Sequence, residues 1–270
     1  MTTIFIRRIV TCVLVALTVV ALPALQTGAE AAANPKSIVI GTGNGYKPYC
    51  YLDEKGNLAG YEIEVLKAVN KLLPQYKFEL NQLEFKNILL SLEAKKVDLG
   101  AHQFEKNDDR QAKYLFGDQS YTNYILHIVV AKGRNDIKSL KDLHGKTIQV
   151  GAGSNSAYVI NSYNKKNNNA VKVVYTNGTD PATTIKRLED GSIDATFSVK
   201  RNVESWNKTF GDRIKIVGGP VSFSNTYYIF RKGDTALKAD FDRALAQLRK
   251  DGTLKKLSQQ VLGGDYTVNE

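Results

Sequence analysis

Short apolar runs alternate with amphipathic segments along most of the chain. Runs of β-branched or alternating apolar residues predict strands, and apolar residues spaced three or four positions apart predict helices. The first series is strand, helix, strand, helix, strand, over Ser37–Gly41, Gly60–Leu73, Tyr76–Leu83, Phe85–Lys96 and Val97–Ala101. This alternation is typical of a parallel sheet with helices on both faces.

The remainder of the chain continues the alternation. Strands are predicted over Tyr124–Ala131, Thr147–Gly151, Val171–Tyr175, Ile193–Ser198, Ile214–Val217 and Asn225–Arg231. Helices are predicted over Lys138–Leu143, Gly153–Lys166, Asp180–Glu189, Arg201–Thr209, Thr235–Lys250 and Leu254–Leu262. Gly218–Pro220 is expected to end the strand before it. The whole pattern predicts an α/β protein with two lobes.

The helix predicted over Gly60–Leu73 has one apolar face. Val65, Leu66 and Val69 fall on that face at helical spacing. Glu62 falls on the opposite face, which predicts that its carboxylate is exposed to solvent.

Residues 1–33 have the composition of a secretory signal peptide. Arg7 and Arg8 form a short basic region, Ile9–Leu25 is apolar, and small residues around Ala31 and Ala33 offer cleavage sites. The sequence therefore predicts a periplasmic protein released by cleavage. An uncleaved anchor is the alternative, but small residues rather than a basic stop-transfer patch follow the apolar run.

Only one cysteine remains after such cleavage. Cys12 lies inside the apolar region and lacks the Leu-Ala-Gly context of a lipid-modified cysteine, so Cys50 has no partner for an intramolecular disulfide. We expect Cys50 to be a small packed residue beside the functional site. A nucleophilic pair with His102 is the alternative, and it lacks a visible third group to orient it.

Charge and composition narrow the functional classes. The chain carries a formal net charge of +10, but its lysines are scattered and no stripe of arginines and aromatics appears, which argues against nucleic-acid binding. The three histidines, His102, His127 and His144, are far apart in sequence. We therefore expect no metal site and no cofactor.

The stretch after Ala101 carries the strongest candidate chemistry. The chain becomes polar where a predicted strand ends, the place where open α/β sheets bind ligands, and Arg110 follows shortly after. A guanidinium there suits bidentate capture of a carboxylate. The alternative is a surface arginine paired with Asp108 or Asp109.

Two further segments offer ligand contacts. A Gly- and Pro-containing loop places Tyr46 and Tyr49 near the end of the first strand, where aromatic faces can support the apolar part of a ligand. Ser154, Asn155 and Ser156 open a predicted helix, and free N–H groups at a helix start attract anions. A plain helix cap is the alternative for the second segment.

Several short stretches, taken in order, resemble one family. They are Gly45–Tyr49, Leu58–Glu64, Asn107–Arg110, Ser139–Lys146, Leu188–Ala195 and the tail around Arg249 and Lys250. The chain from about residue 36 onward resembles the extracytoplasmic solute-binding receptors of polar amino-acid ABC importers (family 3). The resemblance implies a two-lobed type II fold with two hinge strands, in which lobe 1 is 36–124 plus 224–270 and lobe 2 is 125–223.

The resemblance also implies roles for individual residues. Arg110 would hold the α-carboxylate of the ligand, and Tyr46 and Phe85 would enclose its side chain. Donors at Ser154, Asn155 and Ser156 would assist from the other lobe. This receptor would not be an enzyme, and its partners would be an amino acid and a membrane permease, with the receptor itself a monomer.

At one position the chain departs from the family, and this departure makes Glu105 a candidate for binding the ligand ammonium. Many members carry an aspartate for the ligand ammonium just after the strand that ends at Ser198, where this chain has Val199 and Lys200. Glu105 could supply that carboxylate, because a carboxylate facing an ammonium in a closed cleft is a strong charge-assisted bond. The alternative is a surface pair with Lys106.

Within the family, the chain is most similar to the cystine-binding branch. The stretches that carry this similarity are Gln103–Asn107, which includes Phe104, together with Lys113–Phe116 and Asn207–Asp212. Cystine is long and carries two zwitterionic ends, so extra polar groups at His102, Gln103 and Asn225 suit it. Cysteine or a diamino acid is the alternative ligand.

Two other functional classes share this fold. A periplasmic cyclohexadienyl dehydratase, acting on prephenate or arogenate, would need a general acid such as Glu105 or His102. A sensory or adhesive module would need no chemistry at all. The first predicts turnover of prephenate or arogenate, which a receptor would leave unchanged.

Overall fold

The computed structural model describes residues 34–178 and 180–268. The predicted signal peptide, with Cys12, lies outside these residues. The contact pattern separates residues 1–31 from 32–270, and the description below concerns the second unit alone. A bilayer could not be crossed by any helix in the described part of the chain.

The order of helices and strands follows the predicted alternation. The strands are β1 Lys36–Thr42, β2 Gly45–Tyr46, β3 Cys50–Leu52, β4 Leu58–Ala59, β5 Tyr76–Gln82, β6 Leu99–Glu105, β7 Tyr114–Phe116, β8 Thr122–Ala131, β9 Thr147–Gly151, β10 Lys172–Thr176, β11 Ala195–Ser198 and β12 Ile214–Arg231. The helices are α1 Tyr61–Leu72, α2 Phe85–Glu93, α3 Asp108–Lys113, η1 Leu140–Leu143, α4 Asn155–Lys166, α5 Pro181–Glu189, α6 Lys200–Phe210, α7 Thr235–Lys250 and α8 Thr253–Leu262.

Nine of the strands form one mixed sheet. Its order is β10-β9-β11-β8-β12-β6-β1-β5, and β7 pairs with β12 outside this path. β1 is parallel to β5 and β6, and β9 is parallel to β10 and β11, as the alternation predicts. The sheet is not parallel throughout, because β8 and β12 run antiparallel to each other and to their outer neighbours.

The predicted strand break at Gly218–Pro220 is wrong. β12 continues through this stretch as one strand, and its pairing with β8 shifts register between Val217 and Ser222. Proline has no N–H to donate to a ladder, so the unpaired residues form an irregularity within the strand. The break in the hydrophobic pattern therefore marks a place where pairing is lost locally, but the strand does not end there.

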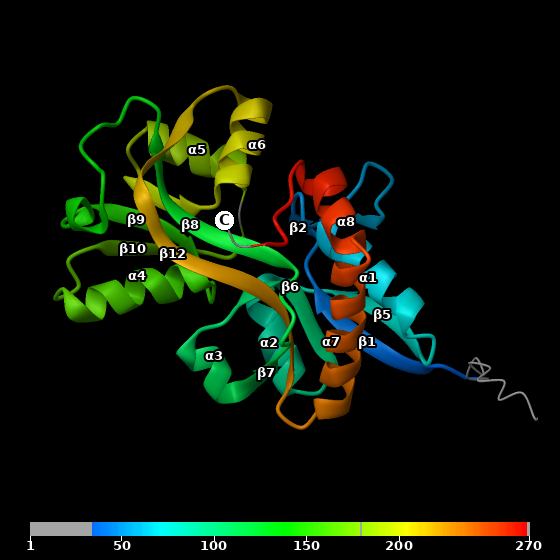
Figure 1. Ribbon diagram of the computed structural model, residues 1–270. Coiled ribbons are helices and arrows are strands. Elements are labelled where there is room, and N and C mark those ends of the chain that lie inside the picture. The colour runs from blue at the N-terminus through cyan, green and yellow to red at the C-terminus, as the bar shows by residue number, and fades with distance from the viewer. Residues whose placement is uncertain (1–33, 179, 269–270) are drawn as a thin grey trace, which may run out of the picture. The chain divides into compact units, whose positions relative to one another are not determined.

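Separate hydrophobic cores lie on the two parts of the sheet. The cores on β1, β5, β6 and β7 use residues from both ends of the chain, such as Ile40, Tyr121 and Phe241. The cores on β9, β10 and β11 use residues between Tyr124 and Val221. We call these the first half and the second half. β8 and β12 run side by side from one half to the other (Figure 1).

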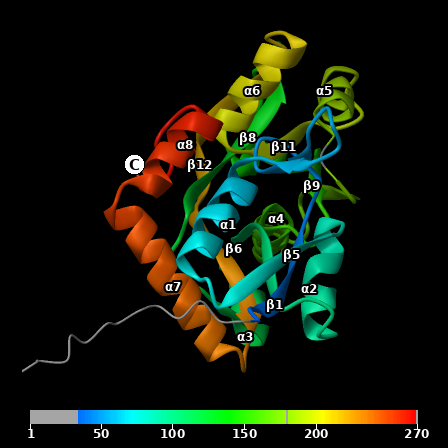
Figure 2. The same ribbon diagram turned by 90° about the vertical axis from the view of Figure 1, so that its right-hand side faces the viewer.

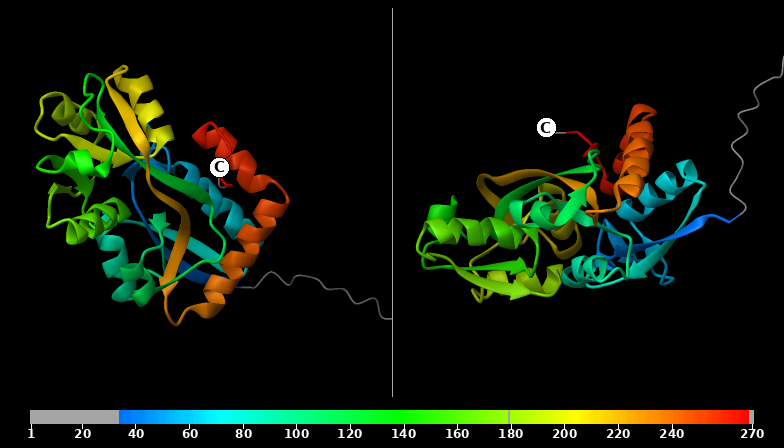
Figure 3. Two further views of the ribbon diagram at one scale, coloured as in Figure 1. Left: turned by 60° about the vertical axis from the view of Figure 1, so that its left-hand side comes forward. Right: turned by 90° about the horizontal axis from the view of Figure 1, so that it is seen from below.

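The last helices belong to the first half. Phe241 of α7 stacks on Phe78 of β5 at 5.2 Å between ring centroids, and Tyr228 of β12 stacks on Tyr121 at 4.6 Å. α1 lies beside α7 and α8 in Figure 2. In Figure 3, α7 and α8 (orange and red) lie beside the blue and cyan elements of the first half, away from the yellow-green elements of the second half. The sequence pattern alone did not show this return.

Two aspartates occupy equivalent places in the two halves. Between α2 and β6, Asp98 Oδ2 accepts the Val39 N–H at 2.8 Å, and the Asp98 N–H donates to the Val39 carbonyl at 2.7 Å. Between α5 and β11, Asp194 Oδ2 accepts the Thr147 N–H at 2.7 Å, and the Asp194 N–H donates to the Thr147 carbonyl at 2.8 Å. Each aspartate thus joins the start of a strand to its parallel neighbour.

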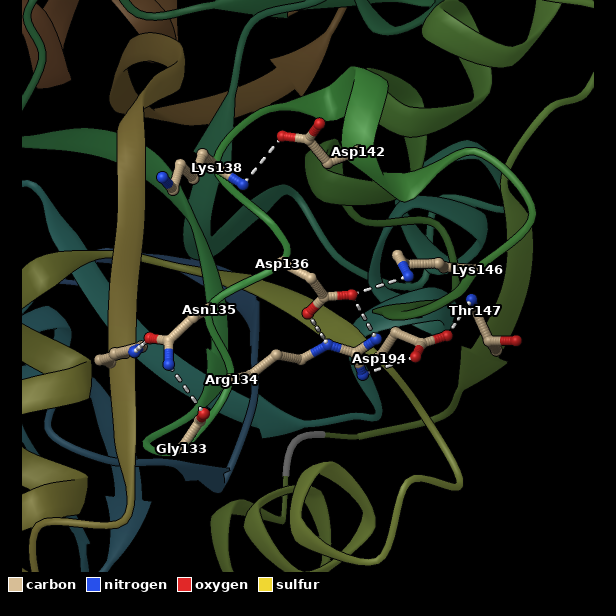
Figure 4. Close-up of polar contacts among 10 residues, drawn as sticks. Gly133, Arg134, Asn135, Asp136, Lys138, Asp142, Lys146, Thr147 and Asp194 are labelled. Atoms are coloured by element: carbon tan, nitrogen blue, oxygen red, sulfur yellow. Dashed lines mark hydrogen bonds and ion pairs between the residues drawn. The ribbon is translucent and has the colours of Figure 1, made fainter.

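Near the end of β12 and of β8, the two strands that connect the halves, an arginine binds one of these aspartates. Arg231 ends β12 and pairs with Asp98 at 3.0 Å. Arg134 follows β8 and pairs with Asp194 at 2.6 Å, with Asp136 bound to the same guanidinium at 2.8 Å (Figure 4). The two connecting strands are therefore fixed at their far ends, one in each half.

Replacing Asp98 or Asp194 with asparagine is expected to lower the free energy of unfolding by about 1–3 kcal/mol each, because each loses a charge-assisted bond to a backbone N–H and an ion pair. Urea unfolding measures the change. Asp212→Asn is the matched control, since Asp212 forms only an exposed pair with Lys132 at 2.6 Å. Equal stability of all three variants and the wild type would contradict the structural role.

Candidate functional site

A cavity of about 300 Å³ lies between the two halves. The predicted residues that line it are Tyr46, Phe85, His102, Gln103, Glu105, Arg110, Ser154, Asn155 and Ser156. They come from β2, the start of α2, β6, α3 and the start of α4. Elements that are far apart in sequence therefore bring most of the predicted site together.

The other predicted residues lie behind or beside this cavity. Tyr49 is fully buried and donates its hydroxyl to Asn202. Phe104 is fully buried beneath Phe85, with ring centroids 5.1 Å apart. Asn225 lies in β12 opposite Asn123 of β8 and does not line the cavity.

Arg110 is buried in the wall of the cavity. Asn107 caps α3 by accepting the Arg110 N–H at 3.0 Å, which fixes the backbone below the guanidinium. The guanidinium donates to the Glu105 carbonyl at 2.8 Å and to the Gly153 carbonyl at 2.9 Å. Burial lowers the pKa of Arg110 to about 10, so the side chain remains cationic at neutral pH. It bonds across the two halves rather than to Asp108.

Glu105 places a second ionisable group in the same cavity. Its Oε1 accepts the Asn155 amide at 2.9 Å and the Ser224 hydroxyl. Burial raises the pKa of Glu105 to about 7, although both hydrogen bonds favour the ionised form. Lys106, the predicted alternative partner, instead lies over the ring of Tyr227, at 3.9 Å from its centroid.

The aromatic side of the cavity is neutral. His102 stacks on Tyr46, with centroids 5.6 Å and planes 6° apart, and contacts Phe85 edge-on at 5.0 Å. Burial lowers the pKa of His102 to about 4, so its imidazole is uncharged at neutral pH. A Cβ at Gly43 would lie 2.2 Å from His102 Nε2, so a larger residue there would displace the ring.

Cys50 does not have the environment of a nucleophile. Its side chain is fully buried, and burial raises the pKa of the thiol above its ordinary value. Reactive cysteines instead have a lowered pKa and partial exposure. Cys50 is a packed residue, as predicted. In the described residues, no group of three or more His, Cys, Asp and Glu side chains gathers as a metal site would require.

Arg201 is a buried residue that the sequence did not identify. It lies in the first turn of α6, yet its guanidinium reaches away from the second half. Its Nε donates to the Tyr49 hydroxyl at 2.5 Å, its Nη2 donates to the Asn123 carbonyl at 2.8 Å, and its carbon Cζ lies 4.8 Å from the Tyr266 ring centroid. These partners lie 65 or more positions away in sequence, so no local pattern points to them.

Asn202, which follows Arg201, completes the contact between the halves. Its Nδ2 donates to the Tyr46 hydroxyl at 3.2 Å, and its Oδ1 accepts the Tyr49 hydroxyl at 3.2 Å. Asn202 also lines the cavity. The start of α6 therefore holds the aromatic loop of the first half against the second half.

The prediction that Glu62 is exposed is wrong. The carboxylate is fully buried against β6, where its Oε2 accepts the backbone N–H and the side-chain amide of Gln103, each at 3.0 Å. Gln103 has a φ of 52°, a conformation that is strained for a side chain of this kind. Glu62 therefore stabilises the bend that directs β6 into the cavity.

Burial raises the pKa of Glu62 from 4.5 to about 7. A raised folded-state pKa stabilises the protein below pH 4.5, and that stability is lost as the pH rises through 7. We expect Glu62→Gln to remove a pH-dependent contribution of roughly 3 kcal/mol over this interval.

Burial of His102 acts in the opposite direction, because its lowered pKa makes stability rise between about pH 4 and 6.5. The informative quantity is therefore the difference between Glu62→Gln and the wild type. Urea unfolding at pH 4.5, 6 and 7.5 measures this difference. A difference that does not change with pH would contradict the assignment of a raised pKa to Glu62.

Comparisons with known proteins identify the family of this chain. Residues 38–264 match the family described as bacterial extracellular solute-binding proteins, family 3. An L-cystine-binding protein TcyJ from Bacillus subtilis is 40% identical over 90% of both chains.

Two solved structures are similar in fold. A putative L-cystine ABC transporter protein from Listeria monocytogenes superposes with a TM-score of 0.81, at 40% identity over 86% of this chain and 98% of that one. A structure from work on glutathione import via GshT and the cystine importer TcyBC of Streptococcus mutans has a TM-score of 0.79, at 30% identity over 87% and 98%. The fold is the predicted two-lobed α/β fold of periplasmic binding proteins. The chain belongs to the bacterial extracellular solute-binding proteins of family 3.

Proposed function

We propose that this protein is the extracytoplasmic receptor of an ABC importer and that it captures L-cystine between its two halves. The observation that carries the proposal is that Arg110 and Glu105 are both buried and both line one cavity. A cation and an ionisable carboxyl in one closed site complement the carboxylate and ammonium of an amino acid. The names of the relatives support cystine as that amino acid.

When the ligand binds, the cavity residues take the place of the water molecules that solvate the free ligand. Arg110 would exchange its bonds to two backbone carbonyls for bonds to the ligand carboxylate, which is a stronger acceptor because it is charged. Glu105 would accept a hydrogen bond from the ligand ammonium, while Asn155 continues to donate to Glu105 Oε1. Tyr46 and Phe85 would cover the apolar disulfide segment.

We infer lobe boundaries from the same observations. Lobe 1 comprises 36–124 plus 224–270, and lobe 2 comprises 125–223, so that β8 and β12 are the hinge strands. The separate cores of the two halves support this division. Hydrogen bonds from Arg110 to Gly153 and from Asn107 to Asn155 at 2.9 Å cross it, which is the arrangement of a closed receptor.

Ligand binding is expected to shift the protein toward this closed form, since the contacts that join the lobes also line the cavity. Small-angle scattering of ligand-stripped protein measures the change as a smaller radius of gyration with saturating L-cystine. Equal radii with and without bound ligand would contradict closure. Trp206, the single tryptophan of the sequence, lines the cavity and offers a fluorescence signal for binding itself.

The relatives are substrate-binding proteins of transporters, which are not enzymes. We propose that this chain likewise binds without chemistry and delivers its ligand to a membrane permease as a monomer. His102 is neutral at neutral pH and cannot act there as a general acid. Incubation with prephenate and arogenate is expected to leave both unchanged.

A further inference from the structure

The cavity contains a second polar group, built entirely from the second half. Gln149 of β9, Thr184 of α5 and Thr196 of β11 line the cavity, and each side chain is at least nine-tenths buried. Gln149 and Thr196 are register partners in the sheet, and the Thr196 hydroxyl donates to the Gln149 carbonyl at 2.9 Å. These residues stand on different elements from Arg110 and Glu105, so the cavity has two polar centres.

The hydrogen bonds within this group leave two donor protons unused. Gln149 Nε2 donates one proton to the Thr184 hydroxyl oxygen at 3.0 Å. An amide nitrogen carries a second proton, and a hydroxyl that accepts one bond can still donate its own. The free proton of Gln149 and the hydroxyl proton of Thr184 are therefore available to an acceptor on a ligand.

A guanidinium stands behind these donors. Arg187 of α5 donates from Nη1 to Gln149 Oε1 at 2.5 Å, which fixes the orientation of the amide and places its nitrogen toward Thr184. The acceptor in this contact is a neutral amide, so the contact itself does not neutralise the guanidinium, although the Asp190 carboxylate at the end of α5 interacts with the same charge. Arg187 does not line the cavity and acts through Gln149, which makes it a positioning residue.

We propose that Gln149 and Thr184, with Thr196 bound to the Gln149 backbone and Arg187 behind them, form a subsite for a second carboxylate on the ligand. The inference rests on the proposed function and extends it to the choice among amino acids. Arg110 holds one α-carboxylate, and the second subsite receives the carboxylate at the far end of a long ligand such as cystine. The donors and the nearby positive charge disfavour the cationic far end of a diamino acid.

The test compares two ligands that differ in one carboxylate. They are L-cystine and the mixed disulfide of L-cysteine with cysteamine, which keeps the disulfide and both ammonium groups but lacks one carboxylate. Calorimetric titration of the wild type is expected to show about thirtyfold weaker binding of the mixed disulfide, as for loss of a charge-assisted hydrogen bond. In Arg187→Met the two ligands are expected to differ by no more than about threefold, because cystine binding weakens while mixed-disulfide binding changes little.

Two further variants serve as a matched control and as an independent check of the subsite. Arg213→Met is the matched control, because Arg213 also binds α5, through Glu189 at 2.7 Å, but does not line the cavity or bond to Gln149. It is expected to retain the wild-type ratio. Thr184→Val removes a cavity donor without changing side-chain volume and is expected to reduce the ratio as Arg187→Met does.

The outcomes separate the two proposals. An equal ratio in the wild type, Arg187→Met and Thr184→Val, with cystine bound by all three, would overturn the second subsite and leave the receptor function standing. No binding of L-cystine to the wild type would overturn the proposed function and the subsite with it. A ratio that falls in Arg187→Met and Thr184→Val but not in Arg213→Met establishes the subsite.

Discussion

Arg110→Ala is expected to weaken L-cystine binding by about a hundredfold or more. The guanidinium is 6% exposed and lies on the cavity wall with its fork directed at two carbonyls, so it is already oriented for a bidentate carboxylate. Truncating one partner of a buried charge pair costs about 2–5 kcal/mol, and 2.7 kcal/mol corresponds to a hundredfold. Calorimetric titration measures the loss.

Arg110→Lys separates charge from geometry. Lysine keeps the positive charge but offers a single point of attachment, so we expect affinity between that of the wild type and that of Arg110→Ala. Circular dichroism at the same temperature shows whether each variant is folded. Cystine binding by a folded Arg110→Ala protein at wild-type affinity would contradict the role of Arg110 as the main anchor.

Arg201→Met is expected to weaken cystine binding by about thirtyfold and to lower the free energy of unfolding by about 3 kcal/mol. The side chain is 8% exposed and joins α6 to Tyr49, Asn123 and Tyr266 across the boundary between the halves. Removing it leaves the Asn123 carbonyl and the Tyr49 hydroxyl without this partner, which costs about 1–3 kcal/mol for each buried group. Affinity falls because these contacts belong to the closed form.

Lys200→Met is the matched control for this prediction. Lys200 precedes Arg201 on α6, but its side chain is 76% exposed and forms only a 3.9 Å pair with Glu204. Its replacement is expected to change neither stability nor affinity measurably. If Arg201→Met behaved like Lys200→Met in urea unfolding and in calorimetry, Arg201 would have no part in joining the halves.

Local pattern was sufficient for much of the site. Ser154 accepts the Ala157 N–H at 3.1 Å, as a serine at a predicted helix start does, and the same helix start faces the cavity. Arg110 lies in α3, five positions after the buried strand β6 ends, so its place near the carboxyl end of that strand could be predicted from topology. The cap and the strand end are properties of short segments, and short segments are what a hydrophobic pattern describes.

The errors arise where distant segments meet. Glu62 looks like a surface residue in the pattern of α1, and only the approach of Gln103, 41 positions later, makes it a buried acceptor. Arg201 lies in the first turn of α6 and Arg187 in the last turn of α5, and their partners lie on other elements. A buried charge is stable only when it has partners, and the sequence pattern does not show which partners the fold brings near it.

β12, one of the two strands that connect the halves, shows a different kind of error. Gly218–Pro220 reads as the end of a strand because glycine and proline disfavour pairing. Pairing on both sides of this stretch, from Ile214 to Val217 and from Ser222 to Thr226 against β8, keeps the strand continuous. Tertiary pairing therefore overrides the local preference and produces the second connection between the halves.

The central claim is that this protein binds L-cystine as a closing receptor, and calorimetric titration of ligand-stripped protein tests it most directly. The protein without its first 33 residues is titrated with L-cystine, and then with L-cysteine, L-arginine and L-glutamine. The account predicts one cystine bound per chain with micromolar or tighter affinity, and weaker binding of the other three. Binding of arginine or glutamine with no heat from cystine would contradict the account.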